Sequence, residues 1–179
     1  LQRLEGESRV YETEVKLRVE DLGVVRDRLR TLDARLKERV EDEHDMLFRS
    51  TTNPPALEGQ VLRLRLQGTE GMLTWKGRPR FEHGIKIREE LQTTVGDART
   101  LREILSRLGY EVRLEFSKSR EYWDMRGLTV SLDELPFGSY VEIEGDQDQL
   151  EQAVTDLGLQ QAERVEKGYP QLAARWFAR

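Results

Sequence analysis

The stretch YETEVKLRV, residues 11–19, alternates polar and apolar side chains with the period of a β-strand. One face of this strand would carry four charged residues and the other mostly apolar ones: Glu12, Glu14, Lys16 and Arg18 against Thr13, Val15, Leu17 and Val19. A surface strand with its charges in water has the same pattern. The stretch therefore raises the question of whether its charged face looks outward or into a site.

The composition of the chain limits the answers. Its 179 residues are enough for one domain with a substantial core. A net charge of −5 gives no general attraction to nucleic acid or anionic membranes, so an anion site must be a local cluster of Lys and Arg. There is no cysteine, which excludes thiolate metal sites, and two histidines are too few for a histidine-rich zinc centre. With no membrane-length apolar run and no signal-peptide core at residues 1–10, we expect a cytoplasmic protein without a nucleic-acid or membrane partner.

Apolar periodicity divides the chain into strands and helices. It predicts eight or so strands, at residues 11–19, 36–49, 60–68, 71–79, 84–93, 110–125, 127–135 and 139–145. Four helices are predicted at residues 21–32, 97–108, 147–157 and 170–177, and residues 78–84 are predicted to form a loop. Apolar helical spacing and strand parity predict packing roles for Leu101, Ile104, Leu105 and Leu108 in the second helix, and for Trp75, Trp123 and Trp176.

Charged residues recur on one face of nearly every predicted strand. An open antiparallel sheet with this face in water is one interpretation. Exposed strand faces usually carry Thr, Ser and Gln as well, whereas Arg, Lys and Glu dominate here, and the strands have few edge protections. These features favour a closed barrel with its charged faces inward. The residues concerned are Arg63, Arg65, Lys76, Lys86, Arg88, Glu90, Lys118, Arg120, Ser131, Asp133, Glu142 and Glu144.

A closed barrel of eight strands would enclose a lumen with about eight cations and six carboxylates. Burying so many charges without a ligand is costly, so a charged guest is implied. Arg and Lys clusters bind phosphate oxygens, and carboxylates would repel a polyphosphate unless they held a divalent cation such as Mg²⁺ or Mn²⁺. The pattern therefore predicts a site for a metal and a polyphosphate.

The segment ETEVK at 12–16 resembles the Glu-x-Glu-x-Lys signature of the CYTH superfamily, the triphosphate tunnel metalloenzymes, which includes class IV adenylyl cyclases, thiamine triphosphatases and inorganic triphosphatases. The segments LRLRL, LTWKG, IKIREE, SKSREYW, LDELPFGSYVEIEG and KGYPQL follow in the order that this family shows. The resemblance implies a single CYTH domain over residues 1–179. Its fold would be α+β, an eight-stranded antiparallel β-barrel tunnel with peripheral helices.

The resemblance also implies residue roles. Glu12, Glu14, Glu142 and Glu144 would bind the metal, and Asp133 would join them or orient water. The triphosphate would be bound by Lys16, Arg63, Arg65, Lys76, Lys118 and Arg120, and strand parity adds Arg88 and Glu90 to the tunnel lining. The residues expected to carry the reaction are Glu12, Glu14, Lys16, Asp133 and Glu144. For Lys167 and Tyr169, docking of the last helix over the tunnel mouth and a phosphate contact are both open.

The chain is similar to bacterial and archaeal proteins labelled class IV adenylyl cyclase by similarity. Functional cyclases of this class carry a His-Phe pair shortly before the first Glu, whereas this chain has LEGESRVYE at residues 4–12. We therefore expect metal-dependent hydrolysis of an inorganic, nucleoside or other organic triphosphate, with cyclisation of ATP as the alternative. A binding module without turnover is a third reading, against which the four glutamates argue. The oligomeric state is open, with a homodimer as one alternative.

Overall fold

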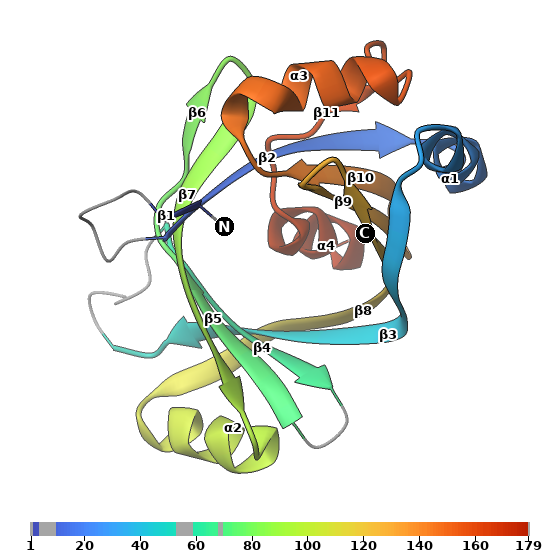
Figure 1. Ribbon diagram of the computed structural model, residues 1–179. Coiled ribbons are helices and arrows are strands. Elements are labelled where there is room, and N and C mark those ends of the chain that lie inside the picture. Colours follow the sequence, from blue (N-terminus) through green and yellow to red (C-terminus); the bar gives the residue numbers. More distant parts are fainter. Residues whose placement is uncertain (1, 4–9, 53–58, 68–69, 179) are drawn as a thin grey trace.

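Eight antiparallel strands form a closed ring around the centre of the structure (Figure 1). The computed structural model describes residues 2–3, 10–52, 59–67 and 70–178. Within these residues the ring strands are β2 (Val10–Val19), β3 (Arg35–Ser50), β4 (Val61–Gln67), β5 (Glu70–Lys76), β7 (Ile85–Val95), β8 (Tyr110–Met125), β9 (Leu128–Leu135) and β10 (Gly138–Glu144). Three shorter strands pair with β2 or β7: β1 (Gln2–Arg3), β6 (Arg80–Glu82) and β11 (Glu163–Arg164). The helices are α1 (Leu22–Thr31), α2 (Ala98–Arg107), α3 (Gln147–Asp156) and α4 (Tyr169–Phe177).

The strand β2, which carries the signature, closes the ring. The order of pairing is β2, β10, β9, β8, β3, β4, β5 and β7, and residues 11–14 of β2 then pair with β7 while residues 14–19 pair with β10. Every pairing is antiparallel, so the predicted eight-stranded antiparallel barrel with peripheral helices is confirmed. The prediction of a loop over residues 78–84 was wrong in part, because Arg80–Glu82 pair with β7 as β6. A strand of only three residues is too short for its alternation to be recognised in the sequence.

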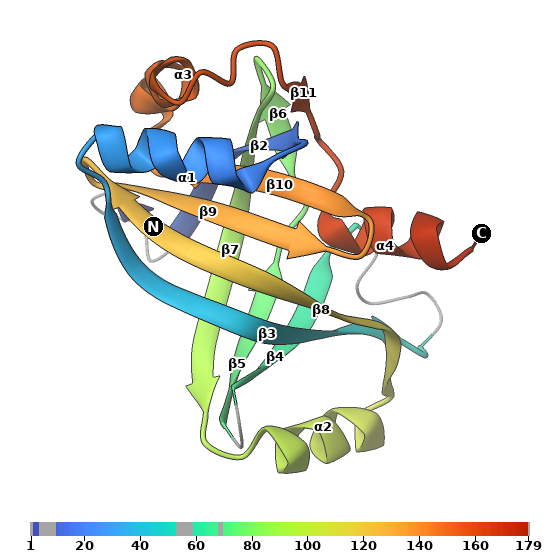
Figure 2. The same ribbon diagram turned by 90° about the vertical axis from the view of Figure 1, so that its right-hand side faces the viewer.

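The apolar faces of the ring strands point outward and are covered by helices. Figure 2 shows α1 and α3 over one side of the ring and α2 over the opposite side. The largest core cluster joins fully buried residues of β2 and β10 to α1 and α3, among them Leu17, Ile143, Leu29 and Leu150. A second cluster packs β3 and β4 on α2 through Met46, Phe48, Leu64, Ala98 and Leu105. Because the helices take up the apolar faces, the charged faces are left to the interior of the ring.

The long strands β3 and β8 are paired with three changes of register, between Leu36 and Glu38, between Val40 and Glu43, and between Leu47 and Phe48. Such irregularities bend a strand pair, which helps a sheet to close. None of the helices that the structure describes is long and apolar enough to cross a membrane.

Three residues predicted to pack in the core are exposed instead. In α2, Leu105 is buried and Leu101 packs beside it, but Ile104 is 48% exposed, and Leu108, just after the helix, is 64% exposed. The helix packs on the ring through Ala98, Leu101 and Leu105, so the surface that it buries is narrower than the apolar face predicted from its sequence. Trp176 is 42% exposed, because it lies nearly one turn beyond Ala173, the last buried residue of α4.

Val24 and Val25 of α1 test the orientation of this helix. They are neighbours of the same type, but Val25 is 2% exposed and Val24 is 67% exposed. We expect Val25→Ala to lower the free energy of unfolding by about 2 kcal/mol, because it removes buried methyl groups and leaves a cavity. Val24→Ala, which makes the same change in helix propensity, should alter it by less than about 0.5 kcal/mol. Chemical denaturation measures both, and equal losses would contradict the orientation.

Candidate functional site

The charged faces of the ring strands enclose a cavity of about 230 Å³. Eight cations and six carboxylates line it, which is the balance that the alternation of the strands predicts. All the residues predicted for the site line this cavity except Asp133: Glu12, Glu14, Lys16, Arg63, Arg65, Lys76, Arg88, Lys118, Arg120, Glu142 and Glu144. Arg18 shares their strand face but is exposed at the end of β2. The charged face of β2 therefore looks into the ring.

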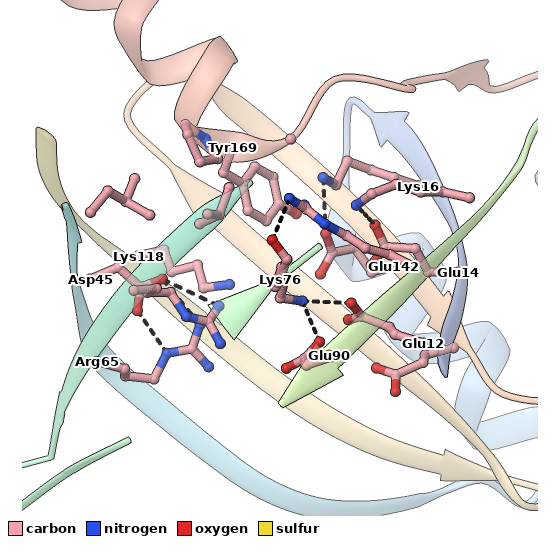
Figure 3. A pocket seen from close by; sticks show the side chains of 18 of the residues that line it. Glu12, Glu14, Lys16, Asp45, Arg65, Lys76, Glu90, Lys118, Glu142 and Tyr169 are labelled. Carbon is pink, nitrogen blue, oxygen red and sulfur yellow. Dashed lines mark hydrogen bonds and ion pairs between the residues drawn. The ribbon is translucent and has the colours of Figure 1, made fainter. Parts of the chain in front are cut away.

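Lysines neutralise the carboxylates contributed by β2 and β7. The Nζ of Lys76 lies 2.6 Å from a carboxylate oxygen of Glu12 and 2.7 Å from one of Glu90 (Figure 3). Lys86 forms an ion pair with Glu14. Lys86 shares the predicted charged face but was given no role, although it lines the cavity. Each of these carboxylates thus has an ammonium group beside it in the absence of a ligand.

Arg65 is held in place by two carboxylates of β3. Its guanidinium donates to both oxygens of Asp45, at 2.8 and 3.0 Å, and lies 2.9 Å from Glu43. Burial would raise the pKa of Asp45, but the charges of Arg63 and Arg65 and the hydrogen bond from Arg65 hold it well below its ordinary value. Tyr122 donates to Glu43 over 2.7 Å. This pairing leaves Arg65 with a fixed orientation.

The roles of Glu43, Asp45 and Tyr122 were missed by the sequence analysis. The acidic run EDEHD at 41–45 was visible, but the register shift between Val40 and Glu43 breaks the simple alternation of the strand. Without the register, the face occupied by each carboxylate could not be assigned.

Asp133 of β9 is fully buried and does not line the cavity, in contrast to its predicted place there. Its oxygens accept hydrogen bonds from the guanidinium of Arg120 and, over 2.6 Å, from the hydroxyl of Tyr169, and Lys118 lies 3.3 Å away. Burial would raise the pKa of Asp133, but Arg120 and Lys118 lower it below its ordinary value. Asp133 thus contacts Arg120 and Lys118 from outside the cavity lining. The sixth carboxylate that lines the cavity is Asp45.

Arg88 lines the cavity as predicted, but its donors are directed at the backbone. Its Nε donates to the carbonyl oxygen of Gly77 over 2.5 Å, and its Nη2 lies 3.4 Å from that of Lys76. Burial is the main reason why its pKa is lowered. Arg88 therefore holds the end of β5, which carries Lys76.

The structure places Lys167 and Tyr169, for which helix docking and a phosphate contact were both left open by the sequence. Tyr169 is buried, begins α4 and lines the cavity, so it serves both helix docking and the site wall. The side chain of Lys167 is exposed, and its carbonyl oxygen lies 3.3 Å from the Nζ of Lys16.

Carboxylates of β2 and β10 lie near one another at one end of the pairing of these strands. Glu14 and Glu144 face each other across the β2 and β10 pairing, an arrangement of like charges that destabilises a sheet. Burial and the charges of Glu12 and Glu14 raise the pKa of Glu144 to about 7. Carboxylate oxygens are the ligands that Mg²⁺ and Mn²⁺ prefer, so by their chemistry Glu12, Glu14 and Glu144 are the residues that would hold a hard divalent cation. Among the described residues no three such side chains are close enough together to form a metal site as they stand, and Glu12 and Glu14 are paired with lysines.

Glu142 and Glu144 lie on the same face of β10 and should respond oppositely to replacement by Gln in metal-free protein. The ionised form of Glu144 is disfavoured in the folded state, so its contribution to stability falls as the pH rises from about 4.5 to about 7 and stays low above that. Glu144→Gln should therefore raise the free energy of unfolding at pH 8 by about 2–3 kcal/mol and change it little at pH 4.

Glu142 supplies the matched control. Burial would raise its pKa, but Lys16 and Arg120 hold it well below the ordinary value, so its ionised form stabilises the fold at neutral pH. Glu142→Gln should accordingly lower the free energy of unfolding at pH 8. Denaturation in EDTA at both pH values measures the pair, and a shift in the same direction for both variants at pH 8 would contradict the assigned charge environments.

Known proteins share this architecture. The CYTH domain matches residues 10–169 of the chain. A protein of Methanocaldococcus jannaschii, named as a candidate adenylate cyclase, is 25% identical over 136 residues, which cover 75% of this chain and 77% of the relative. A candidate adenylate cyclase from Vibrio parahaemolyticus has the same fold, with a TM-score of 0.76 and 20% identity, covering 92% of this chain and 98% of that structure.

A second solved structure, of a candidate adenylyl cyclase from Hippeastrum, is described as revealing a dominant triphosphatase activity. It has a TM-score of 0.68 and 18% identity, and covers 92% of this chain and 96% of that structure. The family match over residues 10–169 and the closed ring with its charged interior lead to one conclusion: the chain belongs to the CYTH domain family.

Proposed function

We propose that this protein hydrolyses a triphosphate in the cavity of the strand ring, with the help of a divalent cation. The observation that carries the proposal is the gathering of eight Lys and Arg side chains around one cavity. Clusters of Arg and Lys bind phosphate oxygens, Arg through its planar guanidinium and Lys as a point charge.

These cations divide into fixed and movable groups. Arg65 and Arg120 are held by Asp45 and Asp133, so they present charge at fixed positions. Lysines have flexible stems and paired ammonium groups, and they can turn from a carboxylate to a phosphate oxygen. Lys16, Lys76 and Lys118 are the lysines for which we propose this role, together with Arg63.

The carboxylates argue against a binding module without turnover. A site that only held a polyanion would be stronger without six carboxylates among its cations. Glu12, Glu14 and Glu144, with Glu142 beside them, would hold Mg²⁺ or Mn²⁺. When bound there, the cation would neutralise charge on the phosphoryl oxygens and assist attack by water. The protein groups position the triphosphate and exclude bulk water.

Cyclisation of ATP is the alternative reaction, supported by the name of the M. jannaschii relative. A cyclase must also place the ribose hydroxyl against the α-phosphorus, and LEGESRVYE at residues 4–12 lacks the His-Phe pair of functional cyclases. The activity described for the Hippeastrum structure supports hydrolysis. Hydrolysis needs only the cations, a metal and water, so it is the reaction we propose.

The proposal is tested with purified protein, Mg²⁺ or Mn²⁺, and three substrates in parallel: tripolyphosphate, ATP and thiamine triphosphate. We expect metal-dependent release of phosphate from at least one of them, with no cyclic AMP formed from ATP. Cyclic AMP with stoichiometric pyrophosphate would establish the alternative reaction. No turnover of any substrate with either metal would support a binding module.

Glu12 gives the sharpest single substitution. We expect Glu12→Gln to lower metal-dependent turnover by about 100-fold or more, because it removes one of the carboxylates proposed to hold the divalent cation, while the protein stays folded. Glu38→Gln is the control, since Glu38 is an exposed carboxylate on β3. Turnover and a thermal unfolding curve should be measured for both variants. Unchanged turnover in Glu12→Gln would remove Glu12 from the mechanism.

A further inference from the structure

Tyr169 has more contacts with the charged site than helix docking requires. It is the first residue of α4 and is 7% exposed. Its ring packs on Tyr140 and Phe137, with centroid distances of 5.4 and 6.5 Å, and projects from the helix into the cavity (Figure 3). An aromatic ring thus forms part of the wall of a cavity that is otherwise lined mainly by charges.

The ring lies beside two of the lysines proposed to bind phosphate. The Nζ of Lys16 is 4.0 Å from the ring centroid of Tyr169, and the Nζ of Lys118 is 4.9 Å from it. Both distances are within the range of a favourable cation–π interaction, which is about 6 Å. One ring therefore attracts two ammonium groups that come from different strands.

The hydroxyl group fixes the orientation of the ring. It donates to Asp133 over 2.6 Å, and Asp133 is held in turn by Arg120. Asp133 is fully buried and lies outside the cavity lining, so its contacts serve its neighbours. The ring is attached by its tip to the same carboxylate that orients Arg120 and approaches Lys118.

An aromatic neighbour differs from a carboxylate in its effect on a lysine. Lys16 is 3.1 Å from Glu142, and Lys118 is 3.2 Å from Glu43, and each of these contacts cancels positive charge. A ring attracts the ammonium through its quadrupole and adds no counter-charge. The ring can thus hold two flexible side chains in place and leave their charge available to a polyanion.

We propose that Tyr169 is a positioning residue of the polyanion site: its ring face holds Lys16 and Lys118 toward the ligand, and its hydroxyl holds the ring through Asp133. The inference rests on the proposed function, because the ligand is taken to be a triphosphate. It also links α4 to the cavity, since the helix begins at the residue that orders the two lysines.

Two variants separate the ring from the hydroxyl. Tyr169→Phe and Tyr169→Leu both remove the hydrogen bond to Asp133 and both keep an apolar side chain, but only Phe keeps the ring face. Binding of tripolyphosphate is measured by calorimetry in EDTA, so that no metal and no turnover contribute. We expect Leu to weaken binding by about tenfold relative to Phe, while hydrogen exchange in α4 is accelerated to a similar degree in both.

A spectroscopic signature tests the contact without any ligand. The ε-methylene protons of Lys16 and Lys118 should show upfield ring-current shifts in the wild type and in Tyr169→Phe, and lose them in Tyr169→Leu. Equal tripolyphosphate affinities for Phe and Leu, or lysine shifts that do not differ between them, would overturn the positioning role. A role in helix docking alone would give equal affinities for the two variants.

The outcome is distinguishable from a failure of the proposed function. A wild-type protein that binds tripolyphosphate and hydrolyses no triphosphate would refute the proposed function, and the difference between Phe and Leu would still support the positioning role. A wild-type protein that hydrolyses a triphosphate but shows no such difference would refute the positioning role alone. A wild-type protein that does not bind tripolyphosphate and hydrolyses none of the three triphosphates would overturn both.

Discussion

The pairing of opposite charges inside the strand ring is the constraint on which the rest of this structure depends. Eight cations and six carboxylates share one enclosed space, and an unpaired charge there would be strongly destabilising. The apolar faces must then point outward, and helices must cover them. The positions of α1, α2 and α3 follow from this requirement, which inverts the usual placement of polar residues on a sheet.

Within that constraint arginines and lysines have different tasks. Arg65 and Arg120 are each bound by a buried carboxylate, and such two-point contacts suit the planar guanidinium. Lys76 bridges Glu12 and Glu90 through a single flexible ammonium group. The site thus combines a rigid frame with side chains that can change partners when a ligand arrives.

Much of this arrangement could be predicted from the sequence. Strand parity predicts which residues share the charged face, whereas the closed ring was predicted from the dominance of Arg, Lys and Glu on that face, the few edge protections and the resemblance to the CYTH superfamily. Strand parity could not predict the register between strands or the contacts that a side chain makes with residues of other elements. The face of Asp45 depends on a register shift against β8, and the burial of Asp133 depends on Arg120 and Tyr169, which lie on other elements. The exposure of Ile104 depends on how wide a surface α2 meets, which its own spacing does not determine.

The double pairing of β2 also bears on how the molecule folds. Glu12 is paired with Arg88, which lies in the middle of the chain. Lys16 is paired with Glu142, which lies in the last quarter of the chain. Contacts between residues so far apart in sequence form slowly, because a long loop must be ordered first. During synthesis β2 can pair with β7 before β10 has been made, but the ring closes only after β10 has left the ribosome. The chemical site is then completed in the same event that seals the barrel, so a partly folded chain has no assembled cavity in which to bind a polyanion.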